Sequence, residues 1–158
     1  MPLQILLRSL LYGAGIVLVQ WLVLGRLRLW GAYPDAVLLF VAWLALRHGR
    51  RAGAISGFVC GFVLDVVYDT WGLHMLVKTM VGFMIGLFPS HEREGTLILP
   101  RQAFIGGLVI ALVHNGLLVT FLALQTGARD SFLVLGLWLG SALYTAVLAT
   151  GYTLVRGR

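Results

Sequence analysis

Hydrophobic residues fill six blocks of the chain, and short segments carrying arginine, glycine, proline or acidic residues separate the blocks. About 20 consecutive apolar residues are enough for a helix to cross a bilayer. We therefore predict an all-α membrane protein, a polytopic bundle without a soluble domain. The expected spans cover residues 6–25, 34–46, 52–69, 72–88, 101–124 and 132–155.

The second block is short. As a helix its thirteen residues would span about 20 Å, against about 30 Å of hydrocarbon. This span must lean on its neighbours, or include the residues from Trp30 to Tyr33. Pro34 and Asp35 predict a conventional helix start, with proline in the first turn and a carboxylate near the positive end of the helix dipole.

The third block carries glycines at every fourth position, and two acids continue this spacing. Residues four apart lie one above another on a helix, so a helix here has a ridge without side chains at one end and an acidic ridge at the other. Such a ridge lets another helix backbone approach closely, which is how membrane helices associate. The ridge consists of Gly49, Gly53, Gly57, Gly61, Asp65 and Asp69. Weaker versions of the spacing are Gly82/Gly86 and Gly136/Gly140.

The composition agrees with this class, because 59% of the residues are hydrophobic and only 11% are charged. We expect a single integral membrane domain over residues 1–158. The one cysteine, Cys60, lies among the ridge glycines and excludes a disulfide framework. The N-terminal block is too long for a signal peptide and has no small-residue cleavage site, so we expect it to be the first span.

The net charge of +6 comes from arginines scattered between the apolar blocks, which indicates membrane topology rather than nucleic-acid binding. With six spans, eight arginines fall on one side of the membrane and three on the other. The larger group predicts that both termini are cytoplasmic. It comprises Arg8, Arg47, Arg50, Arg51, Arg93, Arg101, Arg156 and Arg158, against Arg26, Arg28 and Arg129.

Polar residues inside the spans are costly and therefore carry the candidate chemistry. The depths of Asp65 and Lys78 differ by only about 3 Å, which allows an ion pair between them. Two alternatives stay open for Lys78: a water-filled cavity shared with His74, or extension past His74 and Asp69 to water. We interpret Asp69 itself as a solvated helix end or cap.

His114 and Asn115 lie near the middle of the fifth span, so they must face protein or a wet pocket. We expect them to form hydrogen bonds with a neighbouring backbone or with Tyr144 and Thr145, rather than to bind a ligand. The segment containing His91, Glu92 and Glu94 is expected to be a solvated cytoplasmic turn.

Motifs for catalysis are missing from the sequence. It contains no glycine-rich phosphate loop, no HExxH zinc helix, no G-x-S-x-G elbow, and no carboxylate pair placed with a histidine. We expect neither enzymatic activity nor a cofactor or metal.

A recognisable combination covers about a third of the chain, from Tyr33 to Gly86. It begins with Tyr33-Pro34-Asp35 and a basic turn from Arg47 to Arg51, and continues through the ridge glycines to Asp65, a Gly72-Leu73 turn, Lys78 and Gly82. This combination resembles the rod-shape-determining MreD family of bacteria. The stretch after Asp65 departs from the family pattern, because it reads VVYDTWG where small residues are usual.

The resemblance implies a non-enzymatic membrane subunit of the cell elongation machinery. Its expected partners are MreC and, through MreC, a RodA-type glycosyltransferase and a class B penicillin-binding transpeptidase, with MreB filaments on the cytoplasmic side. The family is also similar in fold to the substrate-binding membrane subunits of energy-coupling-factor transporters. A scaffold would accept a partner's membrane helix at the glycine-lined third span and its neighbours. The alternative is a transporter subunit that binds a small molecule or lipid headgroup at Asp65, His74 and Lys78.

Overall fold

In the computed structural model the chain is helical, and the structure describes residues 3–88, 99–127 and 131–156. The predicted turn with His91, Glu92 and Glu94 lies outside these residues, as does Arg129. The described part confirms the all-α class, and its regular elements are α1 (Leu3–Val19), a π-helical turn (Gln20–Leu24), α2 (Ala36–Tyr68), α3 (Leu73–Ile85), α4 (Pro100–Thr126), a second π-helical segment (Leu133–Gly140) and α5 (Ser141–Arg156). The ends of these helices lie within a few residues of the apolar blocks.

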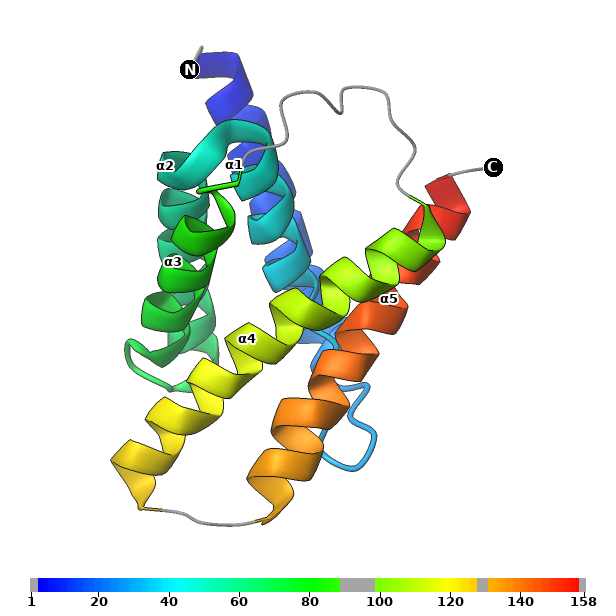
Figure 1. Ribbon diagram of the computed structural model, residues 1–158. Coiled ribbons are helices and arrows are strands. Elements are labelled where there is room, and N and C mark those ends of the chain that lie inside the picture. Colours follow the sequence, from blue (N-terminus) through cyan, green and yellow to red (C-terminus); the bar gives the residue numbers. More distant parts are fainter. Residues whose placement is uncertain (1–2, 89–98, 128–130, 157–158) are drawn as a thin grey trace.

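Helix α2 consists of two arms that meet at Gly49. Gly49 has φ 81° and ψ −175°, a conformation that is open to glycine and closed to residues with a side chain. Phe40 and Cys60 would lie about 30 Å apart in a continuous helix. Both instead lie within 4 Å of the position of a Cβ atom on Gly13, at 3.2 and 3.9 Å. The chain therefore reverses direction at Gly49, as Figure 1 shows.

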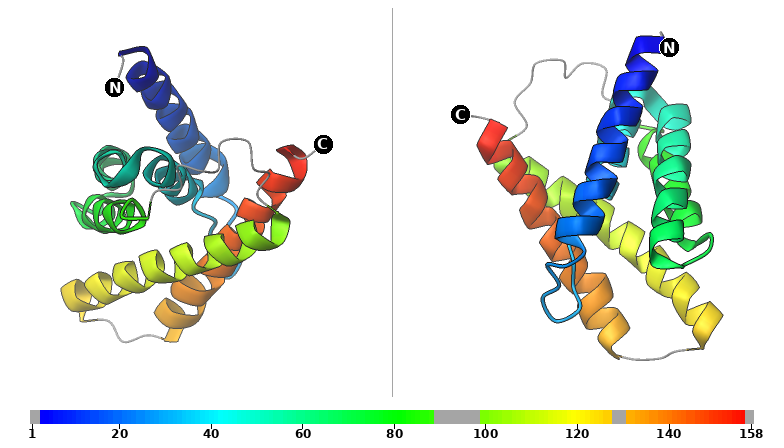
Figure 2. Two further views of the ribbon diagram at one scale, coloured as in Figure 1. Left: turned by 45° about the horizontal axis from the view of Figure 1, so that its top comes forward. Right: turned by 180° about the vertical axis from the view of Figure 1, so that it is seen from behind.

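The helices form two closely packed groups. The second arm of α2 packs along α3, and α4 packs along α5, while α1 lies against α2 (Figures 1 and 2). One hydrophobic cluster joins Val17 of α1 to Val37, Phe40 and Leu64 of α2. A second cluster joins Leu38 to residues of α3, α4 and α5: Leu73, Val77, Val81, Ala111, Leu118 and Ala142. The first arm of α2 is therefore the element that connects both groups.

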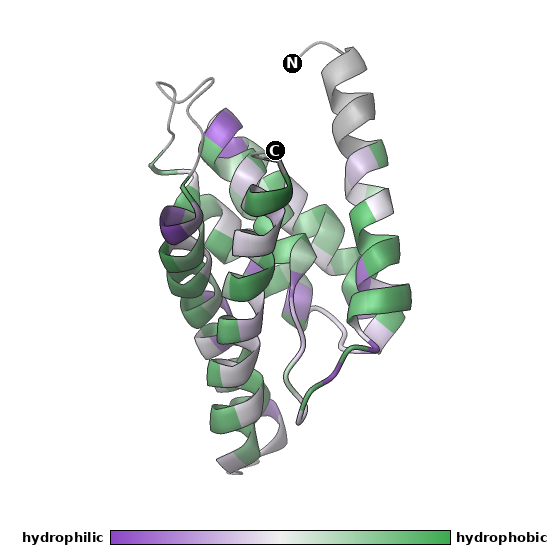
Figure 3. Cartoon of the chain, turned by 90° about the vertical axis from the view of Figure 1, so that its right-hand side faces the viewer, coloured by the Kyte–Doolittle hydropathy of each residue, from purple (hydrophilic) through white to green (hydrophobic). Residues whose placement is uncertain are grey.

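Three helices of the described chain are long and apolar enough to cross a membrane: Ala36–Tyr68, Pro100–Thr126 and Leu133–Val155. Two shorter apolar helices cover Leu11–Leu24 and Leu73–Ile85. Hydrophobic residues cover most of the helices in Figure 3, and strongly hydrophilic residues gather mainly near their ends. The chain has the surface of a membrane protein.

The first arm of α2 starts later than the apolar block suggested. Trp30 to Tyr33 do not extend the helix, because the arm begins at Ala36 with Asp35 as its N-cap. The segment before the arm runs along the second π-helical segment instead. A Cβ atom on Gly136 would lie 3.1 Å from the carbonyl oxygen of Trp30, and one on Gly140 would lie 3.0 Å from the Cβ of Ala32. The Gly136/Gly140 spacing thus accommodates an irregular segment of the same chain.

Candidate functional site

Lys78 of α3 lies at the centre of a buried polar network. Its side chain is fully buried and its ammonium group donates a hydrogen bond to the carboxylate of Asp35, with which it forms an ion pair. Its Nζ also lies 3.3 Å from Nε2 of His114. The ion pair that the depth argument allowed between Lys78 and Asp65 does not form, and Lys78 does not extend to water.

His114 and Asn115 of α4 continue the network towards the second π-helical segment. Asn115 donates from Nδ2 to the carbonyl oxygen of Trp138 at 3.4 Å, which leaves its Oδ1 to accept from Nδ1 of His114 at 2.9 Å. Since Nδ1 then carries the proton, Nε2 of His114 accepts from Lys78. The bond to a neighbouring backbone confirms part of the expectation for this pair. Thr145 bonds Asp35 instead.

Asp35 joins this network to the irregular start of α2. Its Oδ1 accepts from the backbone N–H of Leu38 at 2.7 Å, as an N-cap does, while its own N–H donates to Oγ1 of Thr145 at 3.0 Å. Two further side chains bind the same stretch of backbone. They are Gln20, which bonds Pro34 and Ala36, and Ser141, which accepts from the N–H of Tyr33. Irregular backbone at membrane depth is tolerated when protein groups satisfy it in this way.

The short first arm explains why Asp35 and Lys78 meet. From Gly49 the arm extends about 20 Å to Asp35, whereas Lys78 lies about 12 Å along α3 from Gly86, which packs against Gly49 and Arg50. Helical side chains point towards the N-terminus of their helix, so the long side chain of Lys78 reaches further from the Gly49 end. A longer arm would carry Asp35 past Lys78.

Asp65 has a different role from the one we expected. Its carboxylate accepts hydrogen bonds from Oγ1 of Thr70 at 2.7 Å and from the backbone N–H groups of His74 and Met75, both at 2.9 Å. It therefore caps the N-terminus of α3, where an anion interacts favourably with the helix dipole. Asp69 is exposed and caps the end of α2, as predicted.

The glycine ridge of α2 lies directly against α3. Cβ atoms on Gly53 and Gly57 would each lie 2.2 Å from a carbonyl oxygen of α3, that of Gly82 or Lys78 respectively. On Gly61 a Cβ atom would lie 2.5 Å from the Cα of Met75, and on Gly86 2.4 Å from the Cα of Arg50. The two backbones are in contact along this whole face.

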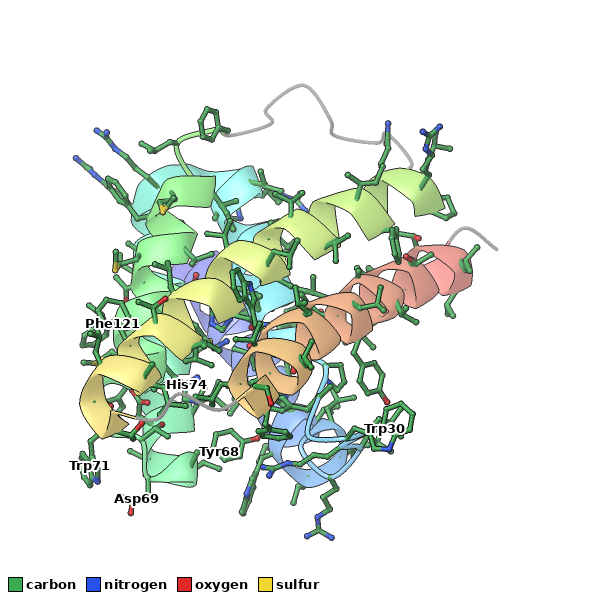
Figure 4. All side chains as sticks on the ribbon, turned by 60° about the horizontal axis from the view of Figure 1, so that its bottom comes forward. Trp30, Tyr68, Asp69, Trp71, His74 and Phe121 are labelled. Carbon is green, nitrogen blue, oxygen red and sulfur yellow. The ribbon has the colours of Figure 1, made fainter. Side chains whose placement is uncertain are left out.

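In the described chain, two buried polar atoms near the turn between α2 and α3 lack hydrogen bonds of the kind that satisfy the network around Lys78. The hydroxyl of Tyr68 and Nδ1 of His74 are buried, and neither has a hydrogen-bond partner among the described residues. The two rings are tilted against each other with centroids 5.9 Å apart. Figure 4 shows both residues at the end of the molecule that carries the turn between α2 and α3. They lie next to the main network but outside it.

This arrangement holds helices together and leaves its strongest polar groups occupied. Asp35, Lys78, His114 and Asn115 bind one another or backbone, and the described residues contain no group of three or more His, Cys, Asp or Glu side chains placed to hold a metal ion. From the sequence we did not predict Asp35 as the partner of Lys78 or of Thr145, and we did not predict roles for Gln20 and Ser141. Their signal was a polar residue inside or beside an apolar block.

Comparison with known proteins agrees with the resemblance of the stretch from Tyr33 to Gly86. Searches of curated proteins and of solved structures found no match. The profile of one family, described as rod shape-determining protein MreD, matches residues 2–126, well beyond that stretch. The chain therefore belongs to the MreD family of rod shape-determining membrane proteins.

Proposed function

We propose that this protein is a non-enzymatic scaffold subunit of the bacterial cell elongation complex, and that it binds MreC. The observation that carries the proposal is the closed network around Lys78. The ammonium group of Lys78 binds Asp35 and His114. The carboxylate of Asp65 binds the N-terminus of α3, and the amide of Asn115 binds a backbone carbonyl oxygen. Groups committed to such internal contacts stabilise one arrangement of helices rather than bind a substrate.

Through MreC the scaffold would contact a RodA-type glycosyltransferase and a class B penicillin-binding transpeptidase, with MreB on the cytoplasmic side and no nucleic acid. We place it in the inner membrane as one domain with six membrane-crossing segments, counting the two arms of α2 separately. The arginine asymmetry supports cytoplasmic termini. The start of α1, the end of α5 and the turn between the two arms of α2 lie at one end of the molecule in Figure 1, which supports an even number of crossings.

The partner helix cannot occupy the glycine ridge in this fold, because α3 of the same chain fills it. Our expectation that the ridge accepts MreC directly is therefore replaced. The ridge sets the position of α3, and the outward faces of the helices remain for the partner. These faces are apolar, with exposed residues such as Ile55, Phe62 and Val66 on α2.

Purification in detergent tests this proposal. The tagged chain is co-expressed with MreC from the same bacterium, and the control is an unrelated single-span protein expressed at the same level. We expect MreC to elute with the chain in size-exclusion chromatography, and the control protein to elute apart. A chain that keeps its cooperative thermal transition but elutes without MreC would contradict the scaffold function.

The second candidate, a membrane subunit that binds a small molecule or a lipid headgroup, is favoured by one observation. Tyr68 and His74 each bury a polar atom without a partner among the described residues. An unsatisfied buried group of this kind costs about 1–3 kcal/mol. A ligand that supplied a hydroxyl or another group able both to donate and to accept would remove this cost.

Replacing these two residues separates the candidates. In a scaffold, Tyr68→Phe and His74→Leu remove unsatisfied groups, so we expect unchanged or higher thermal stability and unchanged retention of MreC. Native mass spectrometry of the wild-type protein should then show no specifically bound small molecule or lipid. A bound species that disappears in both variants, but not in the control Tyr152→Phe at an exposed position of α5, would favour the binding subunit.

A further inference from the structure

Two tryptophans at one end of the molecule have unusual backbone conformations and exposed side chains. Trp30 has φ 49° and is 97% exposed, and Trp71 has φ 20° and is 77% exposed. Positive φ is an outlier for a bulky residue and costs free energy. The Trp71 indole donates from Nε1 to the carboxylate of Asp69 at 2.6 Å within its own turn, and neither ring packs against the body of the chain. Such strain suggests a contact outside the chain.

The turn that carries Trp30 is held firmly. Backbone hydrogen bonds of 3.0 and 2.9 Å join Leu29 and Ala32 across it. Gly31 has φ 81°, and a Cβ atom there would lie 2.1 Å from the ring of Phe132, so the backbone lies directly on that ring. Tyr33, just after the turn, is fixed as well, because its N–H donates to Oγ of Ser141. Trp30 therefore projects from a preformed turn.

The same turn combines positive charge with exposed apolar side chains. Arg26 and Arg28 alternate with Leu27 and Leu29, and both leucines are about half exposed or more, at 48% and 64%. Arg28 is oriented by the carbonyl oxygen of Gly25, to which its Nε donates at 3.0 Å. Arginine complements phosphate, tryptophan is enriched at the level of the headgroups, and leucine favours the hydrocarbon just below them.

The positions of the two tryptophans indicate what they contact. Figure 4 shows Trp30 and Trp71 at the same end of the molecule but on opposite sides. A partner docked on one side would reach one of them, whereas the surface of a bilayer surrounds the protein and reaches both. We propose that the turn of residues 26–31 and the turn of residues 69–72 insert into the phospholipid headgroup layer, with lipid phosphates on Arg26 and Arg28. These turns set how deep the bundle sits in that leaflet.

Fluorescence quenching in vesicles tests the insertion. The full chain is reconstituted into phosphatidylcholine and phosphatidylglycerol vesicles, with bromine placed either near the headgroup end or near the methyl end of the acyl chains. The Trp30 signal is the difference between wild type and Trp30→Phe, and the Trp71 signal is obtained in the same way. We expect both signals to be quenched more strongly by the shallow bromines, and to be shielded from iodide in the aqueous phase.

The arginine contribution is measured at the same indole. Brominated phosphatidylglycerol should quench the Trp30 signal more than brominated phosphatidylcholine at equal content. Arg26→Gln should lower that preference by up to about five-fold, which corresponds to about 1 kcal/mol for a basic residue near anionic lipid. The matched control, Arg101→Gln at the start of α4, lies at the other end of the molecule and should leave it unchanged (Figure 1).

Two results would overturn the proposal. One is a Trp30 signal that stays open to iodide and insensitive to bromine in vesicles, since the turn would then lie in water and present Trp30 to a protein. The other is a Trp30 signal quenched most by the deep bromines, since the turn would then lie inside the hydrocarbon.

Discussion

Replacing Lys78 by methionine should destabilise the protein by about 3–5 kcal/mol, the cost of leaving one member of a buried ion pair without its partner. Methionine fills a similar volume but leaves the carboxylate of Asp35 buried, where the N–H of Leu38 is the one donor that still binds it among the described residues. His114 also loses the donor to its Nε2. Unfolding in mixed detergent and dodecyl sulfate micelles measures the free-energy change.

A double variant identifies the partner. Asp35→Asn removes the stranded charge and keeps an oxygen that can accept from Leu38, so the variant with both Asp35→Asn and Lys78→Met should recover part of the loss. The matched comparison combines Lys78→Met with Asp65→Asn, and we expect those two effects to add, since Asp65 binds the N-terminus of α3 instead. Recovery in the Asp65 pair but not in the Asp35 pair would contradict the network described here.

Gly57→Leu should prevent α2 and α3 from packing. Even the Cβ atom of the new side chain would lie 2.2 Å from the carbonyl oxygen of Lys78 and 2.6 Å from its carbonyl carbon. Backbone cannot move aside as a flexible side chain does, so we expect a loss at or above the upper end of overpacking costs, about 3 kcal/mol. Expression level and the unfolding transition in micelles measure it.

Gly15→Leu in α1 is the matched control. A Cβ atom there would meet no other atom within 4 Å, so the same change should leave stability nearly unchanged. Gly57→Ala should already be harmful, because the clash begins at the Cβ atom. Wild-type expression and stability of both Gly57 variants would mean that α3 does not lie on this face.

Both predictions act on α3 from different sides. The Lys78 backbone packs against Gly57 of α2, while the Lys78 side chain extends to Asp35 and to His114 of α4. One residue thus sets the spacing between two helices and links them to a third. A scaffold that presents fixed outer faces to its partners depends on such contacts.

The sequence by itself determined the helical class, the approximate ends of the helices and the places where helices approach closely. A long apolar block satisfies its own backbone in a membrane when it forms a helix, and glycines four apart leave a groove on such a helix. Asp69 as a helix end also followed from the local sequence, because capping involves neighbouring residues. These features depend on short stretches of chain.

Only the tertiary structure decided which groups meet. The depth argument placed Asp65 near Lys78 but could not assign a direction to either side chain around its helix. The carboxylate of Asp65 is used by the N-terminus of α3, and that of Asp35, 43 positions before Lys78 in the chain, takes the ammonium group. In the same way, glycine spacing predicted a close neighbour for α2 without distinguishing α3 from a partner's helix. A charge or a bare backbone can bind any complementary group. The fold decides which of these groups lies within contact distance.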